Sequence, residues 1–155
     1  MNSIMEKIIK RADETMHLGN GGPFGSAILD KDDNIIAISS NSVLKDNDPT
    51  AHGEINAIRK AGKALGTFDL TGCKLYTTAY PCPMCLGAIM WSNRKEVDYG
   101  CTAEDTGNIG FRDDFMYKFI NNGLKDTNIL KLEELDRKEC QKLFETYEKD
   151  CKKLY

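Results

Sequence analysis

The chain has 155 residues, of which 41% are hydrophobic and 29% are charged, and its formal net charge is -3. These values fit one soluble globular domain over residues 1–155, and no apolar run approaches the ~18 residues that a membrane-spanning helix needs. The net negative charge disfavours a nucleic-acid partner, because binding to phosphate backbones draws on clustered Lys and Arg.

An amphipathic helix is the first predicted element. Ile4, Ile8, Ala12 and Met16 recur four residues apart, up to a glycine-rich cluster at residues 19–22. Charged side chains interrupt this segment, which argues against a secretory signal. We therefore expect a cytoplasmic protein.

A hairpin and a second helix follow. Residues 24–29 and 35–39 are short apolar segments on either side of a loop rich in turn formers, which predicts two antiparallel strands. Asp48-Pro49-Thr50 introduces a helix that is expected to carry Ala51 through Leu65 and to end at Gly66.

Strands and helices alternate in the next part of the chain. Residues 74–78 are typical of a strand, 83–91 of a helix and 96–101 of another strand. Such alternation favours parallel pairing through right-handed crossovers, so we expect an α/β fold in which helices pack on the faces of a mixed sheet. A last apolar stripe of helical period runs from Cys140 to Leu154.

Two short motifs stand where helices are predicted to begin. His52-Gly53-Glu54 lies thirty positions before Cys82-Pro83-Met84-Cys85. Proline suits the first position of a helix, and the positive end of the helix dipole stabilises thiolates there. His52, Cys82 and Cys85 make three ligands for a tetrahedral Zn²⁺, with the fourth position left for water, as in catalytic sites. We expect one zinc ion per subunit, with a catalytic water.

Glu54 is the candidate general base. Thiolate ligands reduce the Lewis acidity of the metal, so a carboxylate that removes a proton from the bound water has an evident role. Two other interpretations apply to the cysteine pair alone: a redox C-x-x-C, or a structural zinc site closed by Cys73, Cys101 or His17. Glu54 at its position makes the structural site less favoured.

The combined pattern resembles a known family. H-x-E followed by P-C-x-x-C is the signature of zinc nucleobase deaminases. Together with Gly21-Gly22-Pro23-Phe24-Gly25, Asn41 and Asn47-Asp48-Pro49-Thr50-Ala51, it is similar to the cytidine deaminase-like superfamily over about residues 1–100. That resemblance implies a three-layer α/β/α fold around a mixed central sheet of about five strands, with helices on both faces.

Features outside the zinc motif resemble bacterial guanine deaminases. These are Phe111, Asp113 and Tyr117 and the C-terminal Cys151-Lys152-Lys153-Leu154-Tyr155. The resemblance implies that Asn41 hydrogen-bonds a purine and that Phe24 contacts its ring. It also implies that Asp113 is a second catalytic residue, which engages the amino group. Tyr155 would close the pocket, and the subunits would form a homodimer. The last apolar stripe has two interpretations, core packing within one subunit or exchange of the C-terminal segment across the dimer.

Two positions depart from the common pattern of the superfamily. Gly53 stands where Ala is usual, which costs helix stability by about 1 kcal/mol. Tyr80 stands before Pro81 where many relatives carry Glu. The contact that this carboxylate makes elsewhere must be absent or replaced here.

The expected reaction is hydrolytic deamination of a nucleobase, with guanine giving xanthine and ammonia. Deamination of adenosine in transfer RNA is the nearest alternative, but Lys and Glu offset each other in the last helix, which weakens it. Deamination of cytosine or another small aminated base comes next. A zinc-stabilised binding module without turnover is the alternative from a different class.

Overall fold

The computed structural model describes residues 2–151 and 153–155, and the chain divides into two compact units between Asp113 and Asp114. In chain order, the elements of the first unit are α1 (Ser3–His17), β1 (Gly25–Leu29), β2 (Ile35–Ser40), α2 (Val43–Asp46), α3 (Gly53–Leu65), β3 (Lys74–Ala79), α4 (Pro83–Trp91), β4 (Val97–Cys101) and α5 (Ala103–Asn108). The second unit holds α6 (Asp114–Asn121) and α7 (Arg137–Asp150). That the whole chain acts as a single domain stays a prediction.

One sheet lies at the centre of the first unit, with the strand order β2-β1-β3-β4. β1 pairs antiparallel with both β2 and β3, whereas β3 and β4 are parallel. The predicted α/β class and mixed sheet are therefore confirmed. The described residues form four strands in this sheet rather than about five, because the fifth strand was implied by the family resemblance and corresponds to no strand segment identified in the sequence.

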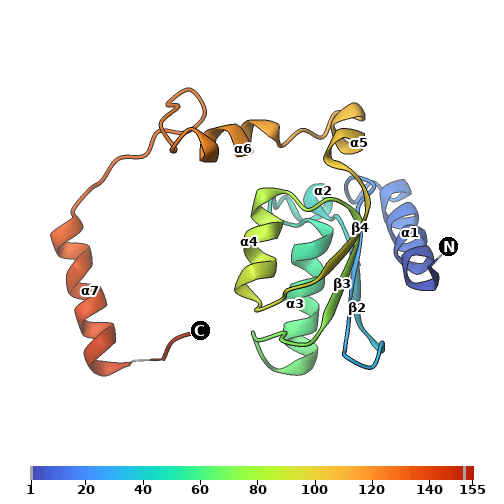
Figure 1. The fold of residues 1–155 in the computed structure, drawn as a ribbon, viewed down its shortest axis with the longest axis horizontal. Coiled ribbons are helices and arrows are strands. Elements are labelled where there is room, and N and C mark those ends of the chain that lie inside the picture. Colours follow the sequence, from blue (N-terminus) through green and yellow to red (C-terminus); the bar gives the residue numbers. More distant parts are fainter. Residues whose placement is uncertain (1, 152) are drawn as a thin grey trace. The chain divides into compact units, whose positions relative to one another are not determined.

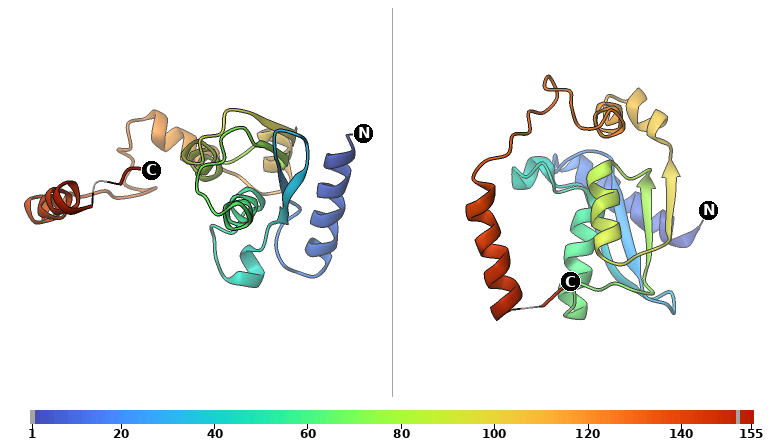
Figure 2. Two further views of the ribbon diagram at one scale, coloured as in Figure 1. Left: turned by 90° about the horizontal axis from the view of Figure 1, so that it is seen from below. Right: turned by 60° about the vertical axis from the view of Figure 1, so that its left-hand side comes forward.

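Helices cover both faces of the sheet, as Figures 1 and 2 show. α1 packs on one face, while α3 packs on the other and contacts α4. β1 is buried along its whole length, since it lies between the two layers. Ile28 of β1 joins the core under α3, whereas Ala27 and Leu29 join the core under α1. This alternation follows from the two-residue period of a strand.

The start of α3 differs from the prediction. The helix begins at Gly53, so Ala51 lies before it. Asp48 accepts hydrogen bonds from both the backbone N–H and the hydroxyl of Thr50, at 2.8 and 2.7 Å. The turn continues into the residues that were expected to be helical, because the backbone N–H groups of Ala51 and His52 donate to the carbonyls of Asp48 and Thr50 at 3.1 and 2.8 Å. The predicted end is confirmed, because Gly66 caps the helix with a φ of 68°, in the left-handed region that suits glycine.

The last helix also differs from the prediction. α7 ends at Asp150, so Leu154 and Tyr155 lie beyond the helix. The Tyr147 hydroxyl donates to the carbonyl of Lys153 after the helix has ended. Leu143 and Phe144 of the predicted stripe are 69% and 70% exposed. No helix in the described part of the chain has the length and apolar character that crossing a membrane requires.

Candidate metal and catalytic site

The site is built at the beginnings of two helices. His52 is the N-cap residue of α3, and Cys82 is the N-cap residue of α4, with Pro83 at its first position. Cys85 follows in the first turn of α4 and is fully buried. Both helix N-termini therefore face the same point, where their dipoles favour negative charge on the sulfurs.

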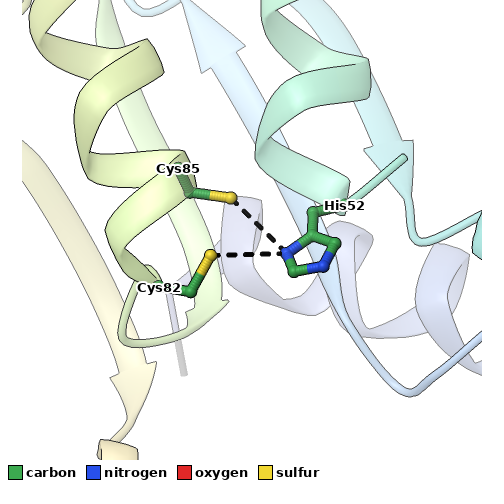
Figure 3. Close-up of side chains that lie close together, drawn as sticks. All are labelled: His52, Cys82 and Cys85. Carbon is green, nitrogen blue, oxygen red and sulfur yellow. Dashed lines mark hydrogen bonds between the residues drawn. The ribbon is translucent and has the colours of Figure 1, made fainter. Parts of the chain in front are cut away.

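The three predicted ligands come together. Figure 3 shows both sulfurs pointing toward the imidazole of His52. The Sγ atoms of Cys82 and Cys85 each lie 3.6 Å from Nδ1 of His52. Among the described residues, these three form the one group of potential ligand atoms that lie within 4.8 Å of each other. Cys73, Cys101 and His17 do not belong to it, so the alternative of a fourth protein ligand from these residues receives no support.

The spacing suits a tetrahedral zinc ion. Zn–S bonds of about 2.3 Å and Zn–N bonds of about 2.05 Å at the tetrahedral angle place sulfur and nitrogen about 3.6 Å apart. The separations between the two sulfurs and Nδ1 of His52 have this value. The donor set and its geometry therefore fit zinc, with three protein ligands.

The protonation of the cluster follows from its contacts. Hydrogen bonds, first from Cys85 and then from His52, lower the pKa of the Cys82 thiol to about 4. The pKa of the Cys85 thiol is raised, because it shares a proton with Cys82 and is buried beside Glu54. The pKa of His52 is raised by its hydrogen bond to Cys82. These contacts therefore favour a thiolate at Cys82 and a thiol at Cys85.

Glu54 lies beside this cluster and is 6% exposed. Its Oε2 atom is 3.5 Å from Sγ of Cys85, and its Oε1 atom accepts a 3.0 Å hydrogen bond from the hydroxyl of Thr77. Burial raises the pKa of the Glu54 carboxyl above its usual value. A carboxyl group whose pKa is raised holds a proton more readily than a free one, which suits a group that must both accept and return a proton.

The residues expected to contact a substrate lie in different parts of the chain. Asn41 follows β2 and is buried, and its backbone N–H donates to the carbonyl of Phe24 at 2.8 Å. The ring of Phe24 meets that of Phe111 edge to face, with centroids 5.0 Å apart. Asp113 precedes α6, and Tyr155 belongs to the second unit. The roles assigned to these side chains stay predictions.

Sequence reasoning missed two contacts in this region. Thr77 donates a hydrogen bond to Glu54. No motif marks this residue, because the contact joins a strand to a helix across 23 positions of the sequence. Tyr80, which stands where many relatives carry Glu, packs its ring edge to face against Tyr99, with centroids 5.0 Å apart. An aromatic contact therefore stands at the position where many relatives carry a carboxylate.

Comparison with known proteins agrees with the site. The family described as "Cytidine and deoxycytidylate deaminase zinc-binding region" matches residues 1–101. Guanine deaminase of Bacillus subtilis is 46% identical over 127 residues, which are 82% of this chain and 81% of that enzyme. The tRNA-specific adenosine deaminase of Haemophilus influenzae is 36% identical over 137 residues, 87% of this chain and 78% of the relative. The crystal structure of the Bacillus subtilis guanine deaminase superposes with a TM-score of 0.90 at 39% identity, and covers 100% of this chain and 99% of that one.

Proposed function

Because this chain belongs to the cytidine and deoxycytidylate deaminase family, we propose that it is a zinc-dependent enzyme that hydrolyses guanine to xanthine and ammonia. The observation that carries the proposal is the cluster of His52, Cys82 and Cys85 with the Glu54 carboxyl beside it. Guanine as the substrate is supported by the 46% identity to a guanine deaminase.

The residues of the chain divide the chemistry between them. His52, Cys82 and Cys85 would hold one zinc ion per subunit. The ion would lower the pKa of a water, which could then act as a nucleophile at neutral pH. Glu54 takes one proton from the attacking water and passes it to the ring nitrogen. Once the oxygen has bonded to the carbon, Glu54 takes the remaining hydroxyl proton and passes it to the amino group, which leaves as ammonia. The carbon that carries the amino group, C2 of guanine, gains oxygen and loses nitrogen, so atoms and protons balance.

Substrate contacts complete the proposal. Asn41 hydrogen-bonds the purine, and Phe24 lies against the purine ring. The ring of Phe111 packs edge to face with that of Phe24. Asp113 engages the amino group that leaves, and Tyr155 closes the pocket. These roles rest on the likeness to guanine deaminases.

A homodimer is part of the same proposal. Leu143 and Phe144 on α7 are exposed in the monomer, and Tyr99 at the edge strand β4 is 48% exposed. Apolar surface of this kind is usually covered by a partner. Exchange of the C-terminal segment between two copies would cover it, and light scattering of the purified protein would measure a doubled mass. The proposed setting is purine metabolism in the cytoplasm.

A panel assay tests the proposed function. Ammonia release is measured from guanine, cytosine, adenine, their nucleosides and a tRNA anticodon stem, with zinc-loaded protein. Guanine should be turned over with the highest kcat/KM. Preference for the tRNA stem would instead favour an adenosine deaminase, and no ammonia from any substrate by zinc-replete protein would favour a binding module.

A further inference from the structure

A short chain of hydroxyl groups leads from the sheet to Glu54. The Ser26 hydroxyl of β1 donates to Oγ1 of Thr77 on β3 at 3.0 Å, and the Thr77 hydroxyl donates to Oε1 of Glu54 at 3.0 Å. Ser26 and Thr77 are direct partners in the β1–β3 register. Both are almost completely buried, at 0% and 1% exposure.

The direction of these hydrogen bonds follows from proton counting. A threonine hydroxyl has one proton to donate and two lone pairs to accept with. Two acceptors compete for the proton of Thr77: Glu54 at 3.0 Å, and the carbonyl of Gly25 at 3.4 Å. The Ser26 hydroxyl donates its proton to a lone pair of the Thr77 oxygen. This polarises the Thr77 O–H bond and strengthens the hydrogen bond that Thr77 donates in turn. The shorter bond to Glu54 is therefore the favoured one.

Gly53 leaves the space that Ser26 needs. A Cβ atom placed on Gly53 would lie 3.2 Å from Oγ of Ser26 and 3.3 Å from the backbone of Gly25. An alanine at this position would press on the Ser26 hydroxyl in surroundings that are close-packed. The glycine next to the metal ligand thus has a steric reason, which offsets its lower helix propensity.

We propose that Ser26 and Thr77 are positioning residues that fix the Glu54 carboxylate for proton transfer, and that Gly53 spares the Ser26 hydroxyl a close contact that a methyl group would make. This inference rests on the proposed function of Glu54. Both residues act through Glu54. The hydroxyl chain sets the orientation of the carboxylate, which general-base catalysis requires to within a fraction of an ångström.

Kinetics of full-length, zinc-loaded variants test the positioning role. Thr77→Val, which keeps the shape but removes the donor, should lower kcat for guanine by about tenfold or more, because hydrogen bonds to charged groups are the stronger ones. Thr77→Ser should retain most of the kcat, and Ser26→Ala should lower it by roughly three- to tenfold. KM and zinc content should not change. Ser39→Ala is the matched control, because Ser39 is a buried serine that faces Ser26 in the β1–β2 register and whose hydroxyl has no hydrogen-bond partner among the described residues.

Two outcomes would overturn the positioning role: an equal kcat for Ser26→Ala and Ser39→Ala, or no recovery in Thr77→Ser relative to Thr77→Val. If Thr77→Val does not fold, Ser26→Ala still decides between these results. A parent protein without activity on guanine contradicts the proposed function instead, and the comparison of variants then uses the panel base that it does deaminate.

A stability cycle tests the steric part without any substrate. The change in melting temperature caused by Gly53→Ala should be more favourable in the Ser26→Ala background than in the parent, because Ser26→Ala removes the atom that lies nearest to the new methyl group. Equal shifts of the melting temperature in the two backgrounds would show that the two positions are independent, and would contradict the proposed steric role of Gly53.

Discussion

Replacement of Glu54 by Gln isolates the proton-transfer step. The side chain is 6% exposed, so the fold tolerates only a substitution of the same shape. The Gln oxygen can still accept the hydrogen bond from Thr77, now 3.0 Å long, and no metal ligand is altered. The variant should therefore keep its fold and its zinc, while it loses the group that accepts and returns protons.

The expected loss is large. General acid–base catalysis contributes about 10²- to 10⁴-fold, so kcat should fall by at least about a hundredfold. This corresponds to a rise of roughly 2.7 to 5.4 kcal/mol in the activation free energy. KM should change much less, because the substrate contacts remain.

The assay follows ammonia release from guanine, with zinc measured by elemental analysis in the same samples. Glu96→Gln, which removes an exposed carboxylate that takes no part in the site, is the matched control for the change in charge. A zinc-replete Glu54→Gln protein with near-parent kcat would refute Glu54 as the base. Loss of zinc from the variant would instead contradict the prediction that the cluster holds the metal without this carboxylate.

Three other outcomes follow from the site and the core. Cys82→Ala should lose zinc and activity together, whereas Cys140→Ala on α7 should lose neither, as metal analysis and kinetics will show. Because the raised pKa of Cys85 keeps its proton in place at neutral pH and the pKa of His52 is raised as well, zinc uptake displaces protons from the cluster, and the apparent affinity should rise by at least about tenfold from roughly pH 7 to 8 and weaken as the pH falls. A chelator-competition titration that shows no pH dependence would contradict this. Arg94 is 5% exposed, burial lowers its pKa to about 10, and its guanidinium nitrogens have no hydrogen-bond partner among the described residues. Arg94→Met should thus raise the free energy of unfolding by about 1–3 kcal/mol, and a lower midpoint in urea would count against this account.

The metal ligands could be predicted because each is specified by local sequence. A cysteine followed by proline marks the first turn of α4, as helix-start rules predict. The same rules place the start of α3 two residues too early, but they still bring His52 to that end of the helix. The hairpin of β1 and β2 is likewise local, since a short turn sets its register.

The support around Glu54 could not be predicted in this way. Ser26 and Thr77 meet only because β1 pairs with β3, a strand that arrives after an intervening helix. Pairing between non-consecutive strands leaves no periodic signal in one sequence. Gly53 therefore appeared as a departure with a cost, and its steric reason is visible only once the neighbouring strand is in place.

The chain makes a long excursion between its first metal ligand and its second. α3 carries the backbone away from His52 and β3 brings it back to Cys82, thirty positions later (Figure 1). A metal ion bound by His52 and Cys82 would close this loop and would bind only the folded form. Its binding free energy would therefore add to the stability of the fold, by roughly 4 kcal/mol when the free metal concentration is about a thousand times its Kd. The melting temperature of the protein should therefore rise with the fraction of molecules that hold the metal.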